Sequence, residues 1–133
     1  MSTKQIDLSI TFGIIGAFLG ALIGELDGLL IALIIFMTVD YITGVLAAIV
    51  KKKLNSEIGY TGILKKCAML LVVIIGNVID TLVIKNGSAC RTAVILFYLS
   101  NEGISIIENY CHMGLPFPEK LKKVLEQLKE NNI

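Results

Sequence analysis

The stretch GLLIALIIFMTVDYITGVLAAIV (residues 28–50) decides the fold of this chain. Thirteen of its 23 residues are Leu, Ile, Phe or Val, and Asp40 is its single charged residue. A helix of about 20 apolar residues crosses the roughly 30 Å hydrocarbon core of a bilayer. Each strongly apolar residue favours insertion by about 0.3–0.6 kcal/mol, and together they outweigh the about 2.5–3.5 kcal/mol that a central Asp costs. This stretch therefore predicts a transmembrane helix.

Three further stretches are poor in charge: residues 8–24, 67–84 and 92–110. Of the 133 residues, 55% are hydrophobic and 17% are charged, whereas about a quarter of the residues in a soluble domain are charged. We therefore predict an all-α integral membrane protein, with a single domain over residues 1–133 that forms a bundle of four transmembrane helices. The composition excludes a soluble enzyme, a disordered chain and a disulfide-linked secreted domain.

The basic residues predict the orientation, because Lys and Arg concentrate in cytoplasmic loops. All twelve lie outside the four stretches. If all four stretches cross with the N-terminus inside, ten basic residues are cytoplasmic and only Lys85 and Arg91 are outside. If residues 92–110 did not cross, the count would be six against six. We therefore predict that both termini are cytoplasmic, and that residues 92–110, which carry several polar side chains, insert only with help from the other helices.

The segments between the stretches predict how the helices are joined. Residues 25–27 are a very short acidic turn, which predicts a tight antiparallel hairpin of the first two helices. Residues 118–130 place apolar residues at helical spacing among charges, which predicts a short amphipathic cytoplasmic helix on the membrane surface or in solvent. Residues 51–66 predict a basic cytoplasmic loop at the membrane surface. The lysines expected to contact anionic lipid there are Lys51, Lys52, Lys53, Lys65 and Lys66.

Glycines predict where helices approach one another closely. Gly16, Gly20 and Gly24 lie one turn apart on one face of the first helix, and Gly44 follows Thr43 in the second. Small residues at this spacing let helix backbones come close, and packing drives helix association in lipid. The face of the first helix is therefore either a self-association surface or a packing surface within the subunit.

Every charge inside the four stretches is acidic, and a carboxylate can be neutralised by taking up a proton. Asp40 lies near the middle of its stretch, where we expect it to be protonated and hydrogen-bonded to Asn77 or Glu102. Three helices carry a polar face, which favours either a shared polar interior or simple hydrogen bonds between helices. The candidate gating residues are Asp40, Thr43, Asn77, Asp80, Asn101, Glu102 and Glu108.

The sequence contains no pattern typical of catalysis or of metal binding. It lacks a Ser-His-Asp set, a Gly-rich phosphate loop and Cys/His metal spacing. A net charge of +1, without a basic stripe, argues against nucleic-acid binding. We therefore expect no enzyme activity, no cofactor and no nucleic-acid partner.

Two long segments resemble a known family. VDYITGVLAAIVKKKLNSEIGYTGILKK (residues 39–66) and NEGISIIENYCHMGLPFPEKLKKVLEQLK (residues 101–129) are similar to the toxin-secretion/phage-lysis holin family. The likeness covers roughly residues 25–130. Matching positions include Asp40, Thr43, Gly44, Ser56, Gly59, Gly62, Asp80, Glu102, Glu108 and Pro116.

The resemblance implies a multi-pass protein of the bacterial cytoplasmic membrane that assembles with itself into pores or lesions. Such lesions release an endolysin, which lyses the host cell, or a large toxin, without stable binding of that cargo. A small four-helix ion or proton-coupled transporter is one alternative, and a non-conducting membrane anchor or regulator is another. The small exporters resemble one another in carrying an essential glutamate in the first helix, whereas residues 8–24 are uncharged.

Overall fold

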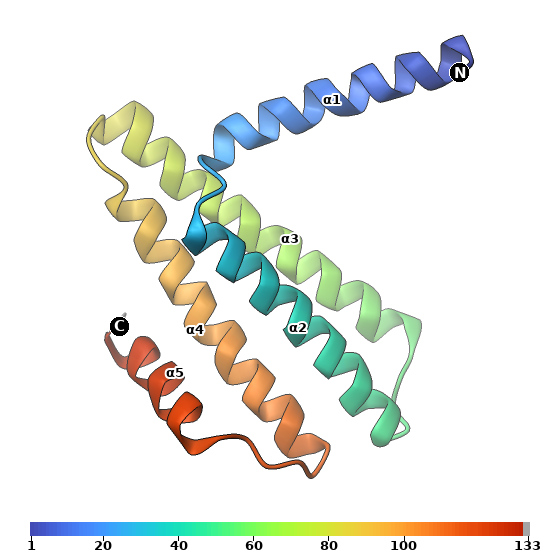
Figure 1. Cartoon of the computed structure of the whole chain (residues 1–133), viewed down its shortest axis with the longest axis vertical. Coiled ribbons are helices and arrows are strands. Elements are labelled where there is room, and N and C mark those ends of the chain that lie inside the picture. The colour runs from blue at the N-terminus through green and yellow to red at the C-terminus, as the bar shows by residue number, and fades with distance from the viewer. Residues whose placement is uncertain (132–133) are drawn as a thin grey trace.

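A computed structural model describes residues 1–131 of the chain, and these residues are helical in large part (Figure 1). The elements, in chain order, are α1 (Thr3–Ile23), α2 (Gly28–Val50), α3 (Ser56–Val78), η1 (Ile79–Ile84), α4 (Ala89–His112) and α5 (Glu119–Asn131). Element η1 is a π-helix that continues α3. No strand occurs among the described residues. The prediction of an all-α fold is confirmed.

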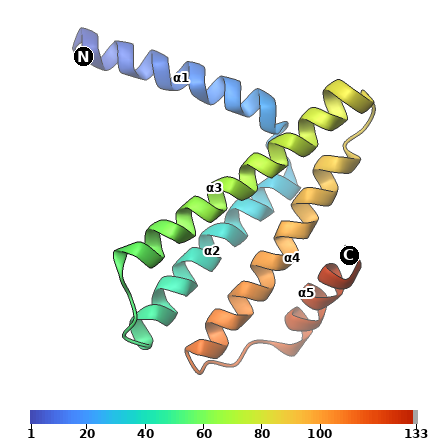
Figure 2. The same cartoon turned by 180° about the vertical axis from the view of Figure 1, so that it is seen from behind.

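Helices α2, α3 and α4 lie side by side and form the body of the molecule (Figures 1 and 2). Helix α2 runs parallel to α4 and antiparallel to α3, as the direction of the chain shows (Figure 1). The apolar core between them contains Leu30, Leu33 and Met37 of α2, Val73 of α3 and Ile95 of α4. The α2 residues recur every three or four positions, which is the spacing that keeps one face of a helix against its neighbours.

Helix α1 does not belong to this bundle. It leaves the body at a wide angle (Figures 1 and 2), and none of its residues is buried. The predicted tight hairpin of the first two helices is therefore wrong, and the bundle has three helices rather than four. The cause lies at the end of α1, where the backbone carbonyl groups of Leu22 and Ile23 accept hydrogen bonds from the side chains of Asn77 and Arg91. These bonds attach the end of α1 to α3 and α4 instead of folding α1 back along α2.

Within residues 1–131, three helical segments are long and apolar enough to cross a membrane: α1, α2 and the continuous segment Ser56–Ile84. Helix α4 is as long, but it carries more polar and charged residues than these three. The structure therefore supports a membrane protein with several apolar helices. The crossing of α4 and the orientation of the chain stay predictions.

The connection between α2 and α3 is shorter than the sequence predicts. Asn55 is the N-cap of α3, and its side-chain oxygen accepts a hydrogen bond of 2.8 Å from the backbone N–H of Ile58. Such a cap satisfies a free donor at the start of a helix. The helix therefore begins at Ser56, and the predicted loop of residues 51–66 is wrong beyond residue 55.

Helix α5 folds back along α4, as Figure 1 shows. The reversal uses Gly114, whose φ of 75° is a left-handed conformation that glycine adopts without strain. The rings of Tyr110 and Phe117, 5.5 Å apart and edge to face, brace the turn. The prediction of a short helix near residues 118–130 is confirmed, but this helix packs on α4, with Leu125 buried against it, rather than lying free.

Candidate functional site

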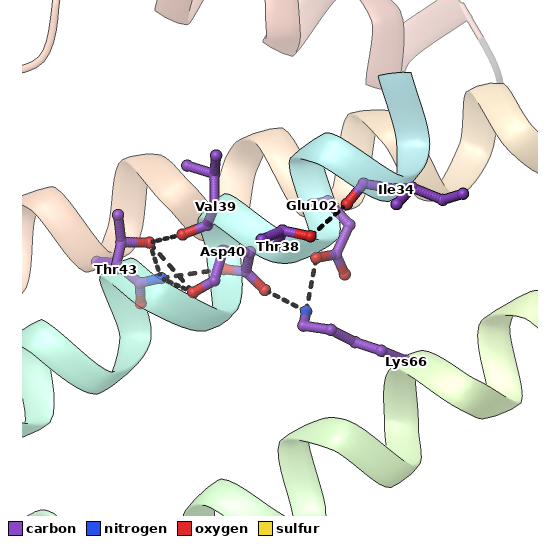
Figure 3. A network of polar contacts seen from close by, with 8 residues as sticks. Ile34, Thr38, Val39, Asp40, Thr43, Lys66 and Glu102 are labelled. Carbon is purple, nitrogen blue, oxygen red and sulfur yellow. Dashed lines mark hydrogen bonds and ion pairs between the residues drawn. The ribbon is translucent and has the colours of Figure 1, made fainter. Parts of the chain in front are cut away.

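Three charged side chains, one from each helix of the bundle, come together in one cluster (Figure 3). The Lys66 ammonium nitrogen lies 2.7 Å from Asp40 Oδ2 and 2.7 Å from Glu102 Oε2. The side chains of Asp40, Lys66 and Glu102 are 12%, 17% and 8% exposed. We call these three residues the charged triad.

The triad pairs charges that would otherwise be costly inside an apolar bundle. A buried ion is tolerated when an opposite charge and hydrogen bonds replace the water it has lost. Lys66 supplies that charge to two carboxylates at once, and it joins α3 to α2 and α4. The expected role of Lys66 in binding anionic lipid is therefore wrong, because its ammonium group faces the interior of the bundle. Asp40 is bound to this lysine and not to Asn77.

Asn109 of α4 extends the triad along α2. Its side-chain Nδ2 group donates to Asp40 Oδ1 at 3.0 Å, to the backbone oxygen of Asp40 at 3.1 Å and to Thr43 Oγ1 at 2.9 Å. Gly44 lies beside this amide, and a Cβ atom at that position would make an ordinary van der Waals contact of 3.7 Å with the Asn109 amide nitrogen. Thr43, Gly44 and Asp40 thus act together as the face of α2 that contacts α4. Asn109 is not among the site residues predicted from the sequence.

A cavity of about 290 Å³ borders the triad. Its lining includes Asp40, Lys66 and Asn109, together with Leu54 and Ile58 near the connection of α2 and α3. A second cavity of about 360 Å³, lined by Lys51, Lys53 and His112 among others, lies between the ends of α2 and α4. Polar groups on the wall and a volume of this size are what an internal site needs to hold water. The first cavity therefore has room for water between Asp40 and Lys66 on one side and the end of the bundle near residues 51–55 on the other.

A second polar cluster lies at the opposite end of the body, and its centre is Arg91. The guanidinium group donates to the backbone oxygens of Ile23 at 2.9 Å and Glu25 at 2.6 Å, and it pairs with Asp27 Oδ2 at 2.7 Å. Arg91 is buried, with 4% of its surface exposed. The hydrogen bond from Arg91 lowers the pKa of Asp27, which also caps α2 by accepting from the Leu30 N–H group. We call this cluster the Arg91 joint, because it connects α1 to the bundle.

Asp80 and Asn77, two of the predicted gating residues, belong to this joint. Asp80 accepts hydrogen bonds from the backbone N–H groups of Cys90 and Arg91 at 3.0 and 2.8 Å. A carboxylate is stabilised at the start of a helix, where N–H groups have no partner within the helix. The structure thus gives Asp80 a capping role at the start of α4. Asn77 binds the end of α1, and neither residue contacts the triad.

The other predicted site residues lie apart from both clusters. Asn101 is half-buried and Glu108 is exposed, as are the lysines at positions 51, 52, 53 and 65. A Cβ atom at Gly16 or Gly20 would meet nothing within 4 Å, so this face makes no packing contact within the subunit. Gly24 differs, because its φ is 91° and a Cβ there would lie 2.8 Å from Asn77 Oδ1. Gly24 therefore belongs to the Arg91 joint.

Comparison with known proteins gives relatives over most of the chain. The family model described as the bacteriophage holin family matches residues 17–130, a range that contains the whole charged triad. An uncharacterised protein of Clostridium acetobutylicum is 45% identical over 94 residues, which are 71% of this chain and 75% of that protein. An uncharacterised 14.9 kDa protein in the nagH 3' region of Clostridium perfringens is 44% identical over 93 residues, 70% of each chain.

A phage protein is among the relatives. A probable holin of Bacillus phage phi105 is 38% identical over 94 residues, which are 71% of this chain and 69% of the phage protein. No solved structure matches the chain.

Proposed function

Because the chain belongs to the bacteriophage holin family, we propose that it assembles with itself in the bacterial cytoplasmic membrane into lesions that let folded proteins pass. The family match over residues 17–130 is the observation that carries this proposal. The family is not a family of enzymes. Three helical segments that are apolar enough to cross a membrane support a site of action in the bilayer.

The cargo of the lesion is an endolysin or a large toxin, which passes without binding stably to this chain. Self-assembly is the second part of the proposal. Its support is the face of α1 that contains Gly16 and Gly20, which is open to another helix because nothing in the subunit packs on it. Small residues on such a face allow close helix contact in lipid. Exposed lysines that follow the C-terminal end of α2 (Lys51, Lys52 and Lys53) are available to anionic lipid headgroups.

The charged triad is the gating element of this proposal. In the isolated subunit it ties three helices together through Lys66. When subunits assemble and water reaches the bundle through the cavity, the charged groups no longer need one another, since water replaces the lost partners. Asp40 then faces the lumen. The change Asp40→Asn keeps a polar side chain but removes the charge, and Asp40→Leu removes both. We expect both changes to shift the onset of killing, with Leu the more severe. If the Asp40→Asn variant killed cells at the wild-type time, at matched protein levels, the charge of Asp40 would not control lesion opening.

The function is tested in bacterial cells that hold a folded endolysin without an export signal. Induction of this chain is expected to release the endolysin and lyse the culture abruptly, whereas either protein alone leaves the cell wall intact. A transporter would pass small solutes and leave the endolysin inside. An anchor or regulator would pass neither. Endolysin retention in cells that contain the full amount of this chain in their membranes would refute the proposal.

A further inference from the structure

Helix α5 packs against α4 where Leu125 meets Gly103. A Cβ atom at Gly103 would lie 2.7 Å from Leu125 Cδ2 and 3.1 Å from Cδ1, so the leucine side chain fills the space that a larger residue at position 103 would need. Leu125 is 9% exposed, while Leu121 and Val124 of the same helix are 53% and 52% exposed. Among the described residues of α5, Leu125 is buried and Lys122 and Leu128 are half-buried, so the place where Leu125 meets Gly103, which we call the Gly103 notch, is the most buried part of this contact.

The position of this notch conflicts with a membrane location for α4. Gly103 lies nine residues before the end of α4 at His112, or roughly 14 Å along the helix at 1.5 Å per residue. That distance is about half the thickness of the hydrocarbon core. Seven of the 13 residues of α5 are charged. A crossing α4 with α5 still attached would carry these charges into the hydrocarbon, where charged side chains are strongly disfavoured.

Helix α4 cannot lie at a different depth from α2, because it packs along α2 and shares the charged triad with it. If α2 crosses the bilayer, α4 lies beside it at the same depth. The two conditions, a crossing bundle and a docked α5, exclude each other as long as α5 faces lipid.

We propose that α5 is an inhibitory clip: while Leu125 occupies the Gly103 notch, α4 and the helices packed on it stay out of the hydrocarbon core, and release of α5 permits them to enter. No ion pair among the described residues has to break when α5 leaves α4. Among residues 1–131, the ion pairs join Lys66 to Asp40 and Glu102, and Arg91 to Asp27, and none includes α5. The chain reverses at Gly114, and this turn places α5 on α4. Movement about the same turn would take α5 off α4. This inference rests on the membrane function proposed above.

A reversible disulfide tests the clip. Leu125 Cγ, close to where the sulfur of a cysteine at 125 would lie, is 3.3 Å from the Cβ position at 103, which suits a disulfide bond. The double variant Gly103→Cys/Leu125→Cys is made in a background where Cys67, Cys90 and Cys111 are alanine. Since the chain contains no Trp, Phe97→Trp on the exposed side of α4 gives a single fluorescent probe. Vesicles contain brominated lipid, which quenches Trp in the hydrocarbon core, and a trapped small dye.

We expect the brominated lipid to quench Trp fluorescence at least tenfold more slowly in the oxidised protein than in the same protein after reduction. Each single-cysteine variant is the control and should respond to neither oxidant nor reductant. Equal quenching with the disulfide closed and open would overturn the clip, and it would mean that the charged face of α5 stays on α4 and lines water. Absence of quenching in the reduced protein would also overturn it. Dye release is read separately: quenching without any dye release refutes lesion formation and leaves the clip standing.

A second pair of variants tests the clip without the double cysteine, in case that variant does not fold. Leu125→Ala empties the notch, and we expect Trp quenching about tenfold faster than in the parent, a change that corresponds to about 1.4 kcal/mol. Leu121→Ala makes the same chemical change one turn earlier at an exposed position, and its quenching rate should equal that of the parent. Equal rates for the two variants would contradict the clip.

Discussion

Removal of the Lys66 charge is the perturbation to which the bundle should be most sensitive. The change Lys66→Met keeps a long apolar side chain but leaves Asp40 and Glu102 without their shared cation. Both lost contacts are 2.7 Å long, and the side chains involved are at most 17% exposed. Removal of one partner from a buried ion pair costs about 3–5 kcal/mol, because the remaining charge stays buried. Partial exposure to the cavity screens the remaining charges, so we expect a loss of about 3 kcal/mol, at the lower end of this range.

The free energy of unfolding is measured in mixed micelles by titration with sodium dodecyl sulfate, with helicity as the signal. Lys65→Met is the matched control, since Lys65 is the exposed neighbour of Lys66, and it should change stability by less than about 0.5 kcal/mol. A triple variant, Lys66→Met with Asp40→Asn and Glu102→Gln, removes all three charges. It should recover most of the lost stability, because no unpaired charge remains.

Two results would refute this reasoning. Equal stability of the Lys66→Met and Lys65→Met variants would show that the triad does not hold the helices together. If the triple variant were as unstable as Lys66→Met alone, the lysine would act through packing of its aliphatic chain and not through its charge.

Three further predictions concern α1, the topology and the Arg91 joint. Gly20→Ile, at an open position, should weaken cross-linked oligomers while insertion stays normal, and Leu8→Ile on the same helix should change neither; undiminished oligomers would assign the glycine face to lipid. In a cysteine-free background that also carries Leu125→Ala to release α5, a membrane-impermeant thiol reagent outside intact cells should label a cysteine at Gly87 but not one at Glu130, and labelling at Glu130 would show that α4 does not cross. The lowered pKa of Asp27 stabilises the fold above the unfolded-state pKa of Asp, about 3.9, and this stability is lost as the pH falls through the lowered value. Asp27→Asn should therefore lower stability at pH 7 and flatten its dependence on pH below about 4, as measured by unfolding in micelles, and an unchanged acid transition would contradict this role.

The sequence predicted those parts of the fold that depend on one segment at a time. The predicted span at residues 28–50 equals α2, because charged residues flank an apolar stretch whose length matches the bilayer. The amphipathic tail helix was also predicted, since the spacing of its apolar residues can be read from that segment alone. The start of α3 was missed, because a single Asn cap outweighs the polar character of the residues that follow.

The charged triad could not be predicted in this way. Hydropathy assigned Lys66 to a loop, whereas its partners lie 26 and 36 residues away along the chain. A useful signal was present: Asp40 and Glu102 are acidic residues in apolar stretches, and each needs a cation from another helix. The direction of α1 depends on bonds between Arg91 and backbone groups more than 60 residues away, which no local pattern encodes.

Release of two cargoes of different size from one vesicle tests the central claim most directly. Purified wild-type protein is added to vesicles that hold a small dye and a folded fluorescent protein of about endolysin size. The account predicts that both leave the vesicles together, because the lesion passes folded protein. Release of the dye alone, with the fluorescent protein retained at every protein concentration, would contradict the account and indicate a narrow channel.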